Sequence, residues 1–150
     1  MAEFEIDGVG FYISWRNQST PDRFVLLKDD VARERYLEQL GRHRGGNVLE
    51  LGIYQGGSAA LAMLAADPAK LVAVDISEPV EALETFRTAR GLEDRLRTHY
   101  RCDQADRAGL ARILDEELGD EPLDLILDDA SHLHDATLAS FEVAFPRLRP

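Results

Sequence analysis

The sequence predicts an α/β fold with a parallel β-sheet, and two observations support this prediction. From residue 47 onward, short apolar segments alternate regularly with segments of helical periodicity. Such alternation implies parallel strands joined by right-handed crossovers. In addition, polar residues follow each of the four predicted strands, at the sheet edge where α/β proteins bind ligands. These polar groups are Glu50-Leu51-Gly52, Asp75, Asp103-Gln104 and Asp128-Asp129.

The first 46 residues are less regular. Residues 11–15 are aromatic and apolar, and residues 17–21 read as a loop. We expect the aromatic segment to pack on the core as an N-terminal arm, with cover over a ligand pocket as the alternative. Residues 22–40 predict a helix that glycines terminate. The residues expected on one side of this helix are Leu27, Val31, Tyr36 and Leu40.

The remaining residues, 47–150, form the predicted sheet domain, and residues 1–46 form an arm and helix expected to cover its substrate or cofactor. Strands are predicted at 47–51, 71–75, 96–102 and 123–128. Helices are predicted at 58–66, 79–90, 106–118 and 135–145. The inward residues expected in the last helix are Leu138, Phe141 and Phe145.

Composition narrows the range of partners. The chain has 150 residues, 45% of them hydrophobic, which suits one domain with a real core. Its net charge of -11 disfavours a nucleic-acid partner, because such affinity comes largely from lysine and arginine. Cys102 is the single cysteine, which fits a reducing cytoplasm, and no apolar run suits a membrane partner. The oligomeric state stays open, a homo-oligomer included.

A glycine loop follows the first predicted strand of the sheet. Gly52 and Gly56 let the backbone approach a ligand closely, and the helix that begins at Ser58 offers free N–H groups. Asp75, at the end of the next strand, can accept hydrogen bonds from two ribose hydroxyls. The combination predicts a nucleoside ligand, whereas the glycines alone would also fit a structural turn.

The glycine spacing indicates which nucleoside. A dinucleotide fingerprint reads G-x-G-x-x-G, but here the order is E-x-G-x-x-x-G-G-S, which gives a looser loop. Glu50 also places a negative charge where a pyrophosphate is unwelcome. S-adenosylmethionine (SAM) has the positive centre and the amino group that suit this loop. These residues resemble the first motif of class I SAM-dependent methyltransferases, and an NAD(P)-dependent oxidoreductase is the alternative.

Residues 124–134, Asp-Leu-Ile-Leu-Asp-Asp-Ala-Ser-His-Leu-His, resemble macrolide-sugar O-methyltransferases of the macrocin and mycinamicin type. The resemblance extends over about residues 22–150, and residues 102–106 also match, with Cys102 in place of a glycine. It implies a Rossmann-like, doubly wound parallel sheet of the class I methyltransferase type. A complete domain of that type has three further strands, so we expect a fold truncated after the fourth strand and helix, as in a fragment of a longer protein.

The resemblance also implies a cofactor site. Glu50, Gly52 and Gly56 would line the methionine end of SAM, and Ser58 would form a hydrogen bond with its carboxylate. Asp75 would hold the ribose hydroxyls, and Asp103 with Gln104 would meet the adenine. The full set is Glu50, Gly52, Gly56, Ser58, Asp75, Asp103, Gln104 and Asp128, the last of which would position the SAM ammonium group or the neighbouring loop.

For catalysis, the resemblance implies that Asp129 is one ligand of a divalent metal, magnesium, and that His132 is the general base. An alcohol is a poor nucleophile until its proton leaves, and a histidine with a pKa of about 6.5 suits that transfer. A hard divalent ion can anchor a diol. The sequence thus predicts methyl transfer to a hydroxyl of a small molecule, a natural-product sugar. A non-catalytic SAM-binding module is a further alternative, and alone His132 would read as a surface or capping residue.

Overall fold

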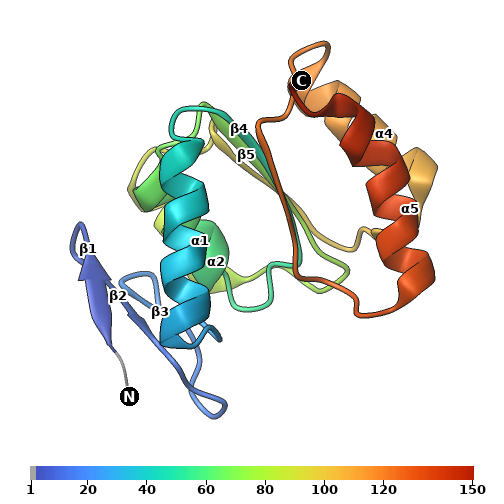
Figure 1. Ribbon diagram of the computed structural model, residues 1–150. Helices are drawn as coiled ribbons and strands as arrows, with labels where there is room; N and C mark the ends of the chain where they lie inside the picture. Colours follow the sequence, from blue (N-terminus) through green and yellow to red (C-terminus); the bar gives the residue numbers. More distant parts are fainter. Residues whose placement is uncertain (1–2) are drawn as a thin grey trace.

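A four-stranded parallel sheet lies between two layers of helices in the computed structural model, which describes residues 3–150 (Figure 1). The strand order is β6-β5-β4-β7. The chain enters at β4, runs outward to β5 and β6, and then crosses back to β7. This reversal creates a switch point between β4 and β7, where a crevice opens at the carboxyl ends. The strands are β4 (Asn47–Leu51), β5 (Lys70–Val74), β6 (Leu96–His99) and β7 (Leu125–Asp128).

Helices cover both faces of the sheet, as the predicted doubly wound fold requires. One face carries α1 (Asp30–Arg42), α2 (Gly57–Ala66) and α3 (Glu81–Ala89), and the other carries α4 (Arg107–Leu118) and α5 (His134–Ala144) (Figure 1). Neighbouring residues of β4 therefore enter different cores: Val48 joins the first and Leu49 the second. Both faces are buried, so most residues of β4 and β5 are apolar, and Asn47 and Glu50 are the buried polar residues of β4.

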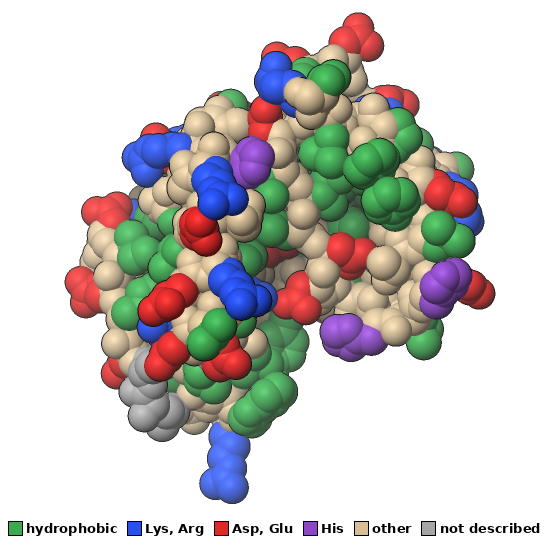
Figure 2. Space-filling model, in the orientation of Figure 1, with side chains coloured by type: hydrophobic (Ala, Val, Ile, Leu, Met, Phe, Trp, Pro, Cys, Tyr) green, Lys and Arg blue, Asp and Glu red, His purple; other side chains and the backbone are tan. Residues whose placement is uncertain are grey.

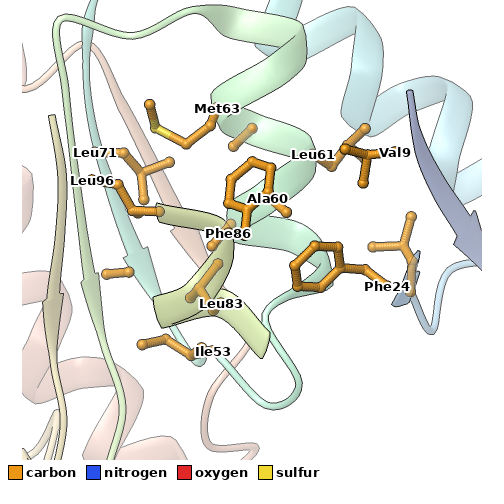
Figure 3. Packing of buried hydrophobic residues seen from close by; sticks show 14 of the residues in the cluster. Val9, Phe24, Ile53, Ala60, Leu61, Met63, Leu71, Leu83, Phe86 and Leu96 are labelled. Carbon is orange, nitrogen blue, oxygen red and sulfur yellow. The ribbon is translucent and has the colours of Figure 1, made fainter. Parts of the chain in front are cut away.

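Small residues bring α2 close to the sheet. Ala59, Ala60 and Ala62 have no exposed surface, and their short side chains leave room for larger residues around them (Figure 3). Two of these are Phe24 and Phe86, whose rings meet edge to face at 5.5 Å between centroids. Most residues of α2 are therefore buried, and this packing holds the N-terminus of the helix beside the glycine loop.

The predicted helix at 22–40 is wrong at its start. Residues Arg23–Val25 form β3, which pairs with β2 (Val9–Tyr12), and β2 pairs in turn with β1 (Phe4–Ile6). Phe24 lies opposite Phe11 in this small sheet and is completely buried, so tertiary packing overrides the local helical pattern. The helix instead begins at Asp30, where the Asp29 side chain accepts a hydrogen bond from the Ala32 N–H at 2.8 Å.

Side chains on that helix also differ from the expectation. Leu40 is buried, as predicted, but Val31 is exposed. In the N-terminal arm, Phe11 and Tyr12 pack in the core, whereas the Trp15 side chain is 80% exposed. The predicted strand at 96–102 is shorter than expected and ends at His99, because Arg101 adopts a positive φ of 56° that turns the chain.

The predicted inward face of the last helix is also wrong. Leu138, Phe141 and Phe145 are 40%, 53% and 53% exposed, and the buried residues are Ala139, Ser140 and Ala144. Small side chains allow α5 to lie close to α4, and the displaced Phe141 and Phe145 rings stack on each other at 4.6 Å. Phe145 itself begins a 3₁₀ turn, η1 (Phe145–Arg147). Figure 2 shows hydrophobic side chains gathered over this side of the molecule.

Candidate functional site

A cavity of about 920 Å³ opens at the carboxyl ends of the parallel strands. Its walls are the β4–α2 loop, the end of β5, the β6–α4 loop, the residues after β7 and the segment at 25–28 that precedes α1. The volume lies in the range of about 300–1,000 Å³ that is common for small-molecule sites. The cavity therefore lies where the switch point of the sheet predicts ligand binding.

The glycine loop contributes Gly52, Ile53 and Tyr54 to the cavity wall, and its two glycines stand where a side chain would clash with neighbouring segments. Gly52 has a φ of +98°, and a Cβ at that position would lie 2.6 Å from the backbone oxygen of Asp129. The exit of β7 is therefore pressed against the end of β4. Gly56, with a φ of +85°, is the N-cap of α2. Gly57 and Ser58, in the first turn of that helix, line the cavity.

Glu50 is buried beneath this loop. Its side chain is 2% exposed, the Tyr36 hydroxyl donates to its Oε1 at 3.4 Å, and its Oε2 has no hydrogen-bond partner among the described residues. Burial raises the pKa of Glu50 to about 7, although the Ser58 hydroxyl and the Lys28 ammonium act in the opposite direction. An unpartnered buried carboxylate is costly, so this position favours a cationic ligand group.

Asp75 ties the end of β5 to the glycine loop. Its Oδ2 accepts hydrogen bonds from the N–H groups of Ile53 at 2.5 Å and Tyr54 at 3.0 Å, and its Oδ1 accepts from Ser77 at 2.7 Å. Partial burial opposes ionisation, but these N–H donors together hold the pKa of Asp75 below its usual value. Asp75 is thus an ionised carboxylate in the wall of the cavity.

Gln104 links the β6–α4 loop to the exit of β7. Its Nε2 donates to the Ser140 hydroxyl at 3.0 Å and to both oxygens of Asp128 at 3.3 Å, and its Oε1 accepts from the Ser131 N–H at 2.9 Å. Gln104 therefore fixes the loop that carries Asp129 and His132. Asp103 is exposed and accepts from the Ala105 N–H at 2.8 Å, which leaves its carboxylate at the cavity wall.

Comparison with known families decides what kind of protein contains this cavity. Residues 49–150 match a family model described as a methyltransferase domain. The chain belongs to this family. A search of curated proteins found no match.

Solved structures of two methyltransferases have a similar fold. The O-methyltransferase from Bacillus cereus, in complex with S-adenosylhomocysteine (SAH), superposes with a TM-score of 0.64 at 21% identity, over 82% of this chain and 54% of that one. An rRNA methylase from Streptococcus thermophilus gives a TM-score of 0.55 at 19% identity, over 83% and 68%. At these identities the likeness establishes the Rossmann-like fold alone.

The mycinamycin-pathway methyltransferase MycE, in complex with Mg and SAH, gives a TM-score of 0.50 at 27% identity, over 82% of this chain and 33% of that one. The methyltransferase domain described here therefore spans about half the length of the Bacillus cereus enzyme and a third of MycE. Within residues 3–150, no helix is both long and apolar enough to cross a membrane.

The structure of the methyltransferase domain brings most of the predicted cofactor residues together. Those that line the cavity are Gly52, Ser58, Asp75, Asp103 and Gln104. Glu50 and Gly56 lie behind its wall, and Asp128 lines an adjoining groove of about 560 Å³ instead. Asp129 and His132 line both the cavity and this groove. Their roles toward a ligand stay predictions.

Asp129 has a partner that the sequence did not indicate. Lys28, in the segment between β3 and α1, places its Nζ 3.0 Å from Asp129 Oδ2 and 4.9 Å from the centre of the Tyr36 ring. Lys28 is the single lysine or arginine among the described residues that line the cavity. No local pattern identifies it, because the contact joins residues 101 positions apart. The exposed Trp15 of the N-terminal arm also lines the cavity, as do Val25, Leu26 and Leu27.

Proposed function

We propose that this methyltransferase domain binds SAM and transfers its methyl group to a hydroxyl of a small molecule. The resemblance of residues 124–134 favours a natural-product sugar as the acceptor. The observation that carries the proposal is the cavity itself, which gathers the glycine loop, Asp75 and His132 from three different strand ends. A nucleoside fits its volume, and the buried carboxylate of Glu50 favours the positive charge that SAM brings.

Methyl transfer to a hydroxyl requires a base close to the methyl group. In O-methylation, the acceptor oxygen attacks the methyl carbon, the carbon–sulfur bond breaks to leave SAH, and the hydroxyl proton passes to a base. His132 is exposed and lies in the wall shared by the cavity and the adjoining groove. An acceptor in the groove would thus meet a cofactor in the cavity at this side chain, which supports His132 as the base.

Asp129 is the one residue that we propose as a magnesium ligand. MycE was crystallised with Mg, and the predicted ligand Asp129 is exposed at the cavity. However, among residues 3–150 no three histidine, cysteine, aspartate or glutamate side chains are grouped to hold a metal ion, and Lys28 already neutralises Asp129. The described residues therefore do not fit a complete metal site.

Calorimetric titration with SAH, with NAD in parallel, tests the cofactor class. We expect one-to-one binding of SAH and no binding of NAD, since the loop lacks a pyrophosphate cradle. Binding of NAD alone would establish the oxidoreductase alternative. If SAH binds, a methyl-transfer assay with hydroxylated sugars and radiolabelled SAM follows, and SAH binding without any transfer would indicate a non-catalytic SAM-binding module.

A further inference from the structure

The ammonium group of Lys28 lies in an unusual position for a structural ion pair. Its side chain is 16% exposed, whereas that of its partner Asp129 is 64% exposed. Burying most of a lysine costs solvation energy, and a partner that remains in water returns little of it. The pair alone therefore gives a weak reason for this lysine to point into the cavity.

The ammonium group also has unused hydrogen-bonding capacity. A lysine ammonium has three N–H donors, and among residues 3–150 Lys28 Nζ has one hydrogen-bond partner, Asp129 Oδ2. The Tyr36 ring, 4.9 Å away, contacts the ammonium without accepting a conventional hydrogen bond. Lys28 can thus hold Asp129 and an anionic ligand group at the same time.

The surroundings of Lys28 match the two charges of an amino acid. The backbone of Val25 and Leu26 lies against Gly57, where an added Cβ would sit 2.1 Å from the Val25 oxygen. The segment that carries Lys28 therefore packs on the first turn of α2, whose free N–H groups attract an anion. Glu50 lies behind the cavity wall, where burial raises its pKa and where Ser58 and Lys28 are both close enough to lower it against that effect. Its buried Oε2 lacks a hydrogen-bond partner among the described residues and suits an ammonium group.

We propose that Lys28 binds the α-carboxylate of the methionine part of SAM while it remains paired with Asp129. The inference rests on the proposed function, since it assigns one end of the same cofactor. Glu50 would take the ammonium group and Lys28, with the N-terminus of α2, the carboxylate. Lys28 would then join the cofactor directly to Asp129 at the exit of β7, where the acceptor is expected.

Two ligands that differ only in the carboxylate distinguish carboxylate binding by Lys28 from a purely structural role. SAH carries the carboxylate, and 5′-S-(3-aminopropyl)-5′-thioadenosine keeps the ammonium group and lacks the carboxylate. Lys28→Met removes the charge and keeps the apolar stem. We expect it to weaken SAH binding roughly 10- to 100-fold, the loss typical of a charged hydrogen bond, and to change the affinity for the analogue by less than about twofold. Calorimetry of the whole chain measures both.

Two further variants control for charge and folding. Lys28→Arg keeps the cation and should retain most of the preference for SAH over the analogue. Arg35→Met removes the same charge from the exposed surface of α1, outside the cavity, and should leave both affinities unchanged. Circular dichroism and the unfolding midpoint show whether each variant is folded.

The outcomes distinguish this inference from the proposed function. If the wild-type chain binds SAH and Lys28→Met weakens SAH and the analogue equally, or weakens neither, the carboxylate assignment is wrong and the cofactor assignment stands. If the folded wild-type chain fails to bind SAH, the proposed function fails and the assignment of Lys28 falls with it. A selective loss for SAH, rescued by arginine, supports both.

Discussion

At the scale of single residues, His132 gives the most direct test of the chemistry. We expect His132→Ala to lower kcat for methyl transfer about 100-fold or more, because the acceptor proton loses its base. SAH affinity should stay the same, since the residue is assigned to the acceptor and not to the cofactor. Turnover assays and calorimetry measure the two quantities.

The matched control for this substitution is His43→Ala at the end of α1, outside the cavity and the groove. This second histidine variant should keep normal turnover. Equal activity of His132→Ala and the wild-type enzyme would rule out His132 as the base, and a loss of SAH affinity in step with turnover would instead indicate a role in cofactor binding.

The titration of Glu50 makes the stability of the folded chain depend on pH. Burial raises its pKa from 4.5 to about 7 in the folded chain, so the folded state holds a proton that the unfolded state has released over that interval. The contribution of Glu50 to stability is therefore fully present below pH 4.5 and is lost as the pH rises through 7. Above pH 7 the ionised Glu50 carboxylate consequently destabilises the folded chain.

The substitution Glu50→Gln removes this titration. We expect the variant to match the wild-type free energy of unfolding near pH 4.5 and to exceed it by roughly 3 kcal/mol above pH 7. Urea denaturation across this pH range measures the difference, and comparison with the wild type cancels the other carboxylates. A difference that is independent of pH would show that burial does not raise the pKa of Glu50 above its value in the unfolded chain.

At the scale of elements, two helical glycines have opposite surroundings. A Cβ at Gly57 in α2 would lie 2.1 Å from the Val25 oxygen, whereas one at Gly41 in α1 would meet nothing within 4 Å. We expect Gly57→Ala to cost about 1–3 kcal/mol because β3 and α2 must separate. Gly41→Ala should stabilise the chain by about 0.5–1 kcal/mol through helix propensity.

Urea unfolding of both glycine variants measures these changes in stability. Since the segment after β3 carries Lys28, Gly57→Ala should also weaken SAH binding, and Gly41→Ala should leave it unchanged. Similar stability of the two variants would contradict the close approach of β3 to α2.

At the scale of the whole molecule, the acidic net charge disfavours a nucleic-acid partner. The chain carries a net charge of -11, and in Figure 2 lysine and arginine side chains are scattered among acidic ones. One similar structure is an rRNA methylase, but a shared fold does not imply a shared substrate. We expect no saturable binding of a fluorescent rRNA duplex at physiological salt, measured by anisotropy. Saturable binding that weakens as salt increases would contradict this prediction.

Much of the fold follows from the sequence because its signals are local. The alternation of strands and helices from residue 47 onward, and the polar residues after each strand, were sufficient to predict the parallel sheet and the edge at which the cavity opens. The glycine loop, Asp75 and Asp129 were found for the same reason, since strand ends and glycines are visible without knowing what packs on them.

Tertiary structure decided the features that depend on distant neighbours. Arg23–Val25 form a strand because Phe24 pairs with Phe11 in the small sheet and is buried there. Phe141 is exposed because smaller residues of α5 pack against α4 in its place. In the site, the raised pKa of Glu50 requires burial that no local pattern reveals, and Lys28 meets Asp129 across 101 positions. The sequence by itself determined which residues stand at the ends of the strands. Only packing decided which charged groups are buried and which are paired, because burial and ion pairing depend on contacts between segments that are far apart in the chain.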